Sequence, residues 1–181
     1  GNELINICLN HPEINIIGLS ANMSAGEKIN FDYIKRQNKT ELYYQKIGEI
    51  DFSNVDFVFN CLPNEGLHKI IEKFPNNIRV IDLSIDFRLN AEKDYLDWYN
   101  FKHNNLGLVE DFKYGLTELN RSQIKNSKHI ANPGCYATSV LIPLTILVQE
   151  QAIRTDNIII DAKSGYSGAG KTKDKEQLLK E

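Results

Sequence analysis

The sequence NPGCYATS, residues 132–139, marks the change from one part of this chain to the next. It follows a short strand-like run, 128–131, and precedes a mostly apolar run, 140–148, that predicts a helix. Cys135 is therefore expected at a strand-to-helix turn. The first N–H groups of a helix lack internal partners and carry partial positive charge, which favours the thiolate of a cysteine placed there. Cys135 is either a nucleophile or a small buried apolar residue, the usual role of a free cysteine.

The composition is that of an ordinary soluble globular protein. The chain has 181 residues, of which 41% are hydrophobic and 25% charged, with a net charge of −3. Its basic residues are dispersed and no apolar stretch has the length of a membrane span, so we expect neither nucleic acid nor a membrane as partner. Cys8, Cys61 and Cys135 are far apart in sequence, which argues against a disulfide framework or a metal site and indicates a reducing compartment, the cytoplasm.

Strand-like and helix-like segments alternate along the chain. This alternation predicts an α/β fold, a Rossmann-like doubly wound parallel sheet. The predicted strands are 13–20, 55–61, 78–83, 128–131 and 157–163, and the predicted helices are 1–10, 67–74, 91–99, 120–125 and 136–150.

Loops at the carboxyl ends of such strands line the nucleotide crevice of doubly wound sheets. The loop after the strand at 13–20 contains Ser20, Asn22 and Ser24, has no acidic residue and is followed by Lys28. That pattern favours the 2′-phosphate of NADP over the free ribose of NAD, and the alternative is a surface loop without a ligand. Pro63 lies in the loop after the strand at 55–61.

A glycine-rich segment, SGYSGAGK at 164–171, follows the last predicted strand. Glycine lets backbone N–H groups approach an anion or a flat ring closely, so the segment is either a binding loop or a flexible connection. Residues 165–172 also match the phosphate-loop pattern G-x-x-x-x-G-K-T. We interpret this match as chance, because the preceding segments already predict a different nucleotide site.

Four sequence blocks together resemble one enzyme family. They are DLSIDFRL at 82–89, YGLTE at 114–118, NPGCYAT at 132–138 and SGYSGAGK at 164–171. Their order and spacing resemble those of N-acetyl-γ-glutamyl-phosphate reductase, an arginine-biosynthesis enzyme of the aspartate-semialdehyde dehydrogenase-like superfamily. The resemblance runs over essentially the whole chain.

The resemblance implies two domains. Residues 1–133 would form an NADP-binding Rossmann-like domain that lacks its first strand and phosphate loop, with Gly1 in the place of the last loop glycine. Residues 134–181 would begin an α+β catalytic and dimerisation domain. The chain would thus be truncated at both ends, and the complete protein would form a homo-oligomer. Because the family's catalytic histidine lies in a later segment, we expect residues 1–181 alone to be inactive.

The resemblance also implies a reaction and a set of residues. Cys135 would attack the acyl phosphate of N-acetylglutamyl 5-phosphate and form a thioester, which NADPH reduces to N-acetylglutamate 5-semialdehyde. Alternatives are a reductase of aminoadipyl or aspartyl phosphate, and a non-catalytic dinucleotide-binding protein. The cofactor contacts implied are Gly1, Ser20, Asn22, Ser24, Pro63, Ser164, Gly165, Ser167 and Gly168, and the substrate contacts are Arg88, Asn132 and Gly134.

The sequence leaves two roles open for Arg88 and gives expectations for the four histidines. Arg88 either contacts an anion or forms a structural ion pair. Among the histidines, His11 and His68 are predicted at the surface, His129 is predicted to be structural rather than close to Cys135, and His103 has no assigned role.

Overall fold

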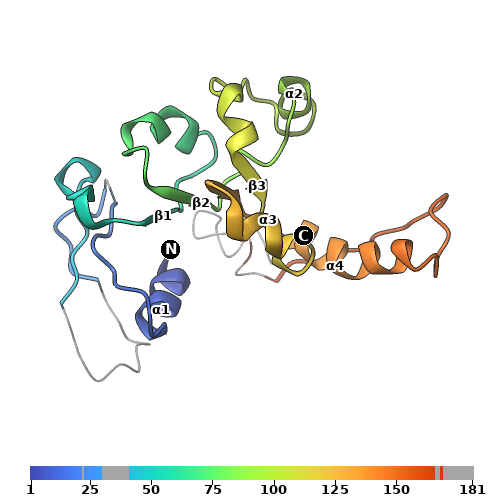
Figure 1. The fold of residues 1–181 in the computed structure, drawn as a ribbon, viewed down its shortest axis with the longest axis horizontal. Helices are drawn as coiled ribbons and strands as arrows, with labels where there is room; N and C mark the ends of the chain where they lie inside the picture. Colours follow the sequence, from blue (N-terminus) through green and yellow to red (C-terminus); the bar gives the residue numbers. More distant parts are fainter. Residues whose placement is uncertain (22, 30–40, 166–167, 169–181) are drawn as a thin grey trace, which may run out of the picture. The chain divides into compact units, whose positions relative to one another are not determined.

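A computed structural model describes residues 1–21, 23–29, 41–165 and 168 (Figure 1). The chain divides into two compact units, Gly1–Asn132 and Pro133–Glu181. Among the described residues, no helix combines the length and the apolar character needed to cross a membrane.

The first unit is built on a parallel sheet, as predicted. Its strands are β1 (Phe57–Asn60), β2 (Arg79–Asp82), β3 (Phe112–Tyr114) and β4 (His129–Ala131), in the order β1-β2-β4-β3. All three pairings are parallel. The last residues of the strands share one row, because Asn60 lies opposite Asp82, and Ala131 lies opposite both Asp82 and Tyr114. All four connecting loops therefore leave the sheet at the same carboxyl edge.

Helices α1 (Asn2–Asn10) and α2 (Glu92–Tyr99) lie where the sequence predicts them. Helix α3 (Thr117–Asn126) begins three residues earlier than predicted, and Asn120 has non-helical dihedral angles within it (φ −115°, ψ 19°). The Asn120 Nδ2 atom donates to the Tyr114 carbonyl, 3.0 Å away, which ties the helix to the end of β3.

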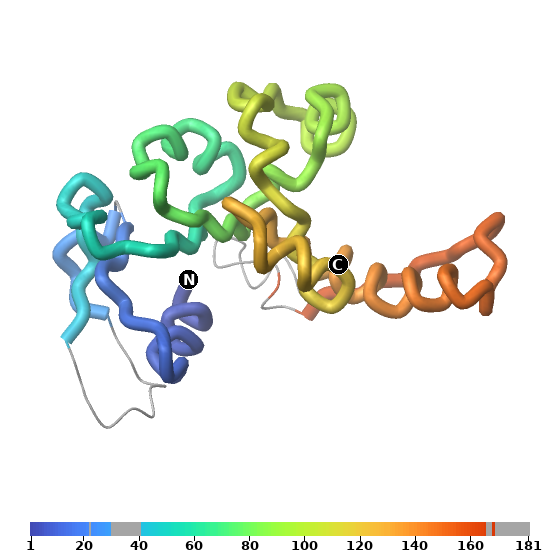
Figure 2. Tube along the Cα trace, viewed as in Figure 1, coloured from blue at the N-terminus to red at the C-terminus, as the bar shows by residue number. Residues whose placement is uncertain are grey.

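The predicted helix at 67–74 is wrong in type. It consists of two 3₁₀ turns, η3 (Leu67–Lys69) and η4 (Ile71–Lys73), visible between β1 and β2 in Figure 2. Ile70, between the two turns, has non-helical dihedral angles (φ −126°, ψ −10°), and Pro75 disfavours the α conformation of Phe74. Three further 3₁₀ turns are η1 (Ile47–Glu49), η2 (Phe52–Asn54) and η5 (Leu106–Asp111).

Two predicted strands are absent from the described residues. Of 13–20, only Ser20 makes a β-bridge, with Gln45, and 157–163 contains no strand. An apolar run forms a strand only where a neighbour completes its hydrogen bonds, and within the first unit 13–20 is not paired with any strand of the four-stranded sheet. Conversely, the three residues of β3 are too few for a recognisable alternation and were not predicted.

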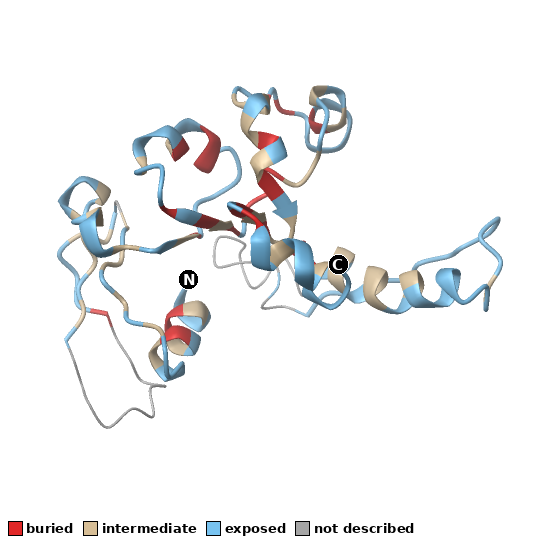
Figure 3. Ribbon diagram, in the orientation of Figure 1, coloured by how far each residue is buried: buried red, intermediate tan, exposed pale blue. Residues whose placement is uncertain are grey.

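The core of the first unit lies against the sheet. Phe87 and Phe112 stack with ring centroids 4.0 Å apart, and Leu67, Val80 and Ala131 complete the cluster with Ile71 and Val109. Burying one such aromatic side chain contributes roughly 1.5–3 kcal/mol. Figure 3 shows the buried residues gathered on the strands and on the segments that follow them.

A second, smaller cluster contains Tyr95, which is fully buried. Its hydroxyl accepts the Leu89 N–H at 3.0 Å, and burial raises its pKa to about 12. This cluster packs α2 beside the loop that follows β2.

The second unit begins with α4 (Cys135–Gln149), whose N-cap residue is Gly134. Both the Thr138 N–H and the Thr138 hydroxyl donate to the Gly134 carbonyl at 2.9 Å. The helix contains Pro143, and none of its described residues is buried within the unit. The predicted helix start is confirmed, and Cys135 is its first residue.

Gly115 gives a direct test of the packing between β3 and β4. A Cβ atom at Gly115 would lie 2.7 Å from Ile130 Cγ2 and 3.2 Å from the Ala131 carbonyl oxygen, whereas a Cβ at Gly107 meets nothing within 4 Å. We expect Gly115→Ala to reduce the free energy of unfolding by about 1–3 kcal/mol, because the stiff, β-branched Ile130 side chain must shift and the Ala131 carbonyl must yield slightly. Gly107→Ala should change it by less than about 0.5 kcal/mol. Urea denaturation measures both, and equal effects would contradict the close approach.

Candidate functional site

A buried carboxylate lies at the centre of the carboxyl edge. Asp82, the last residue of β2, is completely buried. Its Oδ1 accepts hydrogen bonds from Asn60 Nδ2 at 2.7 Å, the Ser84 N–H at 2.9 Å and the Ser84 hydroxyl at 2.8 Å. Burial raises the pKa of the Asp82 carboxyl, while these hydrogen bonds oppose the increase.

The ladder of the sheet continues beyond the ends of the strands. The Asn132 N–H donates to the Asp82 carbonyl at 2.8 Å, and the Leu83 N–H donates to the Asn60 carbonyl at 3.0 Å. The backbone of Asn132 is thereby held beside the loop that follows β2. Asn132 is three residues before Cys135.

The Arg88 side chain also binds the backbone of Asn132 and Leu83. Its Nε donates to the Asn132 carbonyl at 2.8 Å, and its Nη2 donates to the Leu83 carbonyl at 2.9 Å. These partners are neutral carbonyl oxygens, so the alternative of a structural ion pair is not the arrangement found. The structure thus brings together Arg88 and Asn132, two of the residues predicted as substrate contacts.

Cys135 and Gly134 belong to the second unit. Gly134 is half-buried and Cys135 is exposed at the first position of α4. The interpretation of Cys135 as a small buried residue therefore does not hold within this unit. An exposed thiol at a helix N-terminus is accessible to an electrophile.

Two predicted cofactor segments are joined by Tyr44. The Gly26 N–H, in the loop that contains Ser24, donates to the Tyr44 carbonyl at 2.7 Å. The Tyr44 hydroxyl donates to Asn2 Oδ1, 3.5 Å away, at the start of α1. Ser20 and Gly1 are exposed, Ser24 is half-buried, and Asn22 lies outside the described residues.

The loop that contains Pro63 is tightly folded. The Gly66 N–H donates to the Pro63 carbonyl at 3.1 Å, and a Cβ at Gly66 would lie only 2.8 Å from that oxygen. Glu65 has a left-handed conformation, φ 64°, which costs a non-glycine residue about 1–2 kcal/mol. Pro63 itself is exposed at the end of this loop.

These features fit a dinucleotide in the first unit. The close approach of Gly66 to the Pro63 carbonyl follows the carboxyl end of β1, and the Ser24 loop is tied through Tyr44 to the N-terminus of α1. The glycine-rich segment predicted as a cofactor loop belongs to the second unit, where Ser164, Gly165 and Gly168 are exposed and the Gly168 N–H donates to the Gly165 carbonyl at 2.9 Å. Ser167 lies outside the described residues.

Three histidines are buried in the first unit. His129 Nδ1 accepts the Val80 N–H at 3.0 Å, so its structural role is confirmed. His103 Nδ1 accepts the Asn105 N–H at 3.1 Å, and its Nε2 therefore carries the proton and donates to the Asp86 carbonyl at 2.6 Å. The surface prediction for His68 is wrong, because only 1% of this side chain is exposed. His11 is exposed, as predicted.

Metal binding finds no support in the part of the chain that the structure describes. No group of three or more His, Cys, Asp or Glu side chains there could hold a metal ion. No disulfide is formed by Cys8, Cys61 or Cys135.

Two family models match the chain. The family model for the semialdehyde dehydrogenase NAD binding domain matches residues 1–127, and that for the semialdehyde dehydrogenase dimerisation domain matches residues 135–181.

The chain belongs to the semialdehyde dehydrogenase family.

Curated relatives narrow the resemblance. The chain is 42% identical over 173 residues to the probable N-acetyl-gamma-glutamyl-phosphate reductase, chloroplastic, of Oryza sativa subsp. japonica, covering 94% of this chain and 41% of that protein. It is 41% identical over 180 residues to N-acetyl-gamma-glutamyl-phosphate reductase of Ehrlichia canis, covering 99% of this chain and 52% of that protein. The chain thus spans about half the length of these relatives, and the resemblance carried by the four sequence blocks is confirmed.

A solved structure has the same fold. Aspartate semialdehyde dehydrogenase II from Vibrio cholerae superposes with a TM-score of 0.55 at 20% sequence identity, over 82% of this chain and 39% of that one. The predicted α/β fold of a semialdehyde dehydrogenase is therefore confirmed.

The sequence prediction missed Asn60 and the roles of Ser84 and Asp86. Asn60 ends the apolar run of β1 and Asp82 ends that of β2. A polar residue at the last position of two buried strands is a signal of a common edge, and it could have indicated Asn60.

The buried imidazoles make stability depend on pH. Burial lowers the pKa values of His103 and His129. The unfolded chain therefore binds more protons than the folded one as the pH falls below about 6.5, and the free energy of unfolding should decrease by up to about 1.4 kcal/mol per pH unit for each group. Asp82, whose pKa is raised, acts in the opposite direction.

Urea denaturation between about pH 7.5 and about pH 5.5 measures this decrease. His129→Gln, which keeps an acceptor near the Val80 N–H but does not titrate, should flatten the pH dependence. His11→Gln, at an exposed position, is the matched control and should leave it unchanged. A pH dependence that is equally steep in all three proteins would contradict the prediction.

Proposed function

We propose that the complete protein is an NADPH-dependent reductase that converts N-acetylglutamyl 5-phosphate into N-acetylglutamate 5-semialdehyde and phosphate. The observation that carries this proposal is that the Asn132 backbone is held by hydrogen bonds to the Asp82 carbonyl and from Arg88. Cys135, three residues later, is an exposed cysteine at a helix N-terminus. The similarity to reductases of that name supports the choice of substrate.

The proposed chemistry uses Cys135 as the nucleophile. Its sulfur attacks the carbonyl carbon of the acyl phosphate, the bond from that carbon to the phosphate oxygen breaks, and phosphate leaves with the electron pair. The dinucleotide, when bound, supplies the hydride that reduces the resulting thioester. The carbon–sulfur bond then breaks, which releases the aldehyde and restores the thiolate. The N–H groups of the first turn of α4 are suited to stabilise the oxyanion.

The first unit would hold the dinucleotide. Gly1, Ser20, Ser24 and Pro63 are the proposed contacts in residues 1–133, together with Asn22. Ser164, Gly165, Ser167 and Gly168, in residues 134–181, would lie against the nicotinamide. The preference for NADP is supported by the absence of an acidic residue from 20–25, although the nearby Lys28 is paired with Glu41.

The remaining partners and the compartment are part of the proposal. A homo-oligomer is supported by the match to a dimerisation domain. Three cysteines without a disulfide are consistent with the reducing cytoplasm.

Replacement of the nucleophile tests the mechanism. In the full-length protein, Cys135→Ser should lower kcat by at least about a thousandfold, because serine lacks a ready anion at neutral pH. The assay follows phosphate-dependent reduction of NADP by N-acetylglutamate semialdehyde through NADPH absorbance. Cys61→Ser, at another exposed cysteine, is the matched control and should retain activity.

The outcomes separate the alternatives. Full activity of Cys135→Ser would refute the thioester mechanism. If the wild type turns over aspartate semialdehyde but not N-acetylglutamate semialdehyde, the assigned substrate is wrong and is aspartyl phosphate instead. No turnover with either aldehyde, despite NADP binding, would favour the non-catalytic dinucleotide-binding protein.

Arg88 and Gly134 are the proposed substrate contacts, with Asn132. Arg88→Lys should raise the KM for inorganic phosphate in the same assay by about tenfold, because an ammonium cannot reproduce the directed donors of a guanidinium. Arg79→Lys is the control, since Arg79 is exposed and lies over the Phe57 ring. An equal KM in both variants would remove Arg88 from the substrate site.

A further inference from the structure

The side chain of Asp86 is a second buried carboxylate, and it lies outside the proposed chemistry. Asp86 is completely buried, and none of the ion pairs among the described residues involves it. Its Oδ1 accepts the Glu65 N–H at 2.7 Å and its Oδ2 accepts the His68 N–H at 3.0 Å. A buried charge that is satisfied by backbone N–H groups is costly to maintain, so its position requires an explanation.

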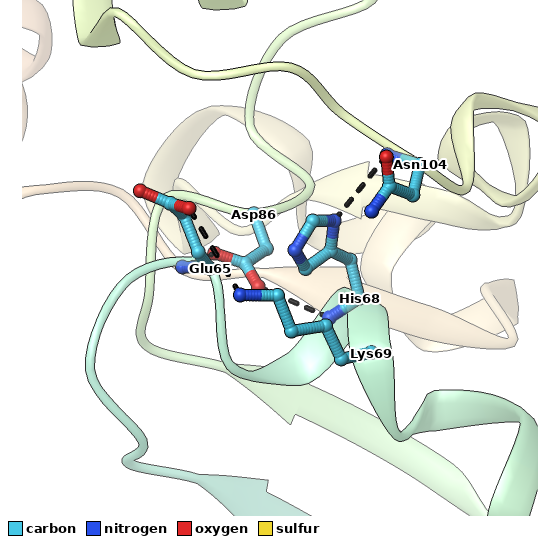
Figure 4. Close-up of polar contacts among 5 residues, drawn as sticks. All are labelled: Glu65, His68, Lys69, Asp86 and Asn104. Carbon is cyan, nitrogen blue, oxygen red and sulfur yellow. Dashed lines mark hydrogen bonds and ion pairs between the residues drawn. The ribbon is translucent and has the colours of Figure 1, made fainter.

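We propose that Asp86 is a positioning residue that holds the Pro63 loop in the conformation required for dinucleotide binding. Figure 4 shows its carboxylate directed toward the backbone of Glu65 and His68. The two hydrogen bonds span the end of the loop and the start of η3. This inference rests on the proposed function, in which Pro63 contacts the cofactor.

The conformation of Glu65 shows what the hydrogen bond accomplishes. Glu65 has φ 64°, a conformation that side-chain-bearing residues rarely adopt. The Glu65 carboxylate does not explain this backbone conformation. It is exposed, and its ion pair with the Lys69 ammonium, at 4.0 Å, is a weak surface contact. The buried acceptor that Asp86 offers to the Glu65 N–H is the contact that selects the left-handed backbone.

Asp86 is itself fixed on the opposite side. Its N–H donates to the Ser84 hydroxyl oxygen at 3.2 Å, and its carbonyl accepts from His103 Nε2 at 2.6 Å. Ser84 is in turn bound to Asp82 at the end of β2. The side chains of Asp86 and Ser84 thereby connect the Pro63 loop to Asp82 at the end of β2. Since Asp86 is fully buried, it positions the loop without touching a ligand.

Asp86→Asn in the full-length protein is the direct test. Asparagine preserves the volume but turns an NH₂ donor toward one of two backbone N–H groups. We expect the Kd for NADP, measured by titration calorimetry, to rise about tenfold, and the KM for NADPH to rise equally while kcat changes less than about twofold. Hydrogen exchange of the Glu65 and His68 amides should accelerate.

Two substitutions at Glu65 distinguish positioning from a general loss of structure. Glu65→Gly in the Asp86→Asn background should recover about threefold or more of the lost affinity, because glycine adopts φ near 64° without the carboxylate. Glu65→Ala alone keeps the N–H and removes the carboxylate, so it should bind NADP as the wild type does.

An unchanged Kd in Asp86→Asn, with or without a lower Tm, would overturn the inference, and so would a fall in kcat at unchanged Kd. If Asp86→Asn does not fold, Ser84→Ala replaces it, since it removes only the acceptor of the Asp86 N–H and one donor to Asp82. That variant should raise the Kd about threefold, and an unchanged Kd would again overturn the inference. Failure of the wild type to bind NADP would instead refute the proposed cofactor.

Discussion

The common register of the four parallel strands is the constraint on which the site depends. Asn60, Asp82, Ala131 and Tyr114 end their strands in one row, so every following loop emerges at the same edge. Parallel strands require crossover connections, and those connections carry the rest of the first unit. The edge is therefore the one place where segments distant in sequence can contribute side chains to a common surface.

This edge contains polar groups that a packed core would not favour. Asp82 and Asp86 are both buried, and both are satisfied by amide and hydroxyl donors rather than by a cation among the described residues. A carboxylate held in this way loses hydration that the hydrogen bonds only partly replace. Such networks persist where they fix a geometry more narrowly than apolar packing can.

The sequence predicts the elements that local pattern determines. The sheet strands with clear apolar runs, the helices α1, α2 and α4, and the helix start at Cys135 all follow from periodicity and turn residues. The apolar runs at 13–20 and 157–163 fail because strand formation depends on a neighbour that the local pattern does not contain. His68 fails for a related reason, since a 3₁₀ turn buries a different face than the α-helix that its segment predicts.

The sequence motif could be predicted to belong to a site, but the hydrogen bonds through which its residues hold the backbone could not. Every second residue of 82–88 is polar, and each one holds backbone or the next polar residue: Asp82 binds Ser84, Ser84 binds the Asp86 N–H, Asp86 binds the loop after β1, and Arg88 binds the Asn132 carbonyl. Of these four residues, the resemblance of sequence implies a ligand contact only for Arg88. Their geometry indicates that most of the motif is committed to holding loops. Asp82, Ser84 and Asp86 are buried and hold backbone, whereas Arg88, at the end of the motif, is half-buried, and the proposed contacts Pro63 and Cys135 are exposed.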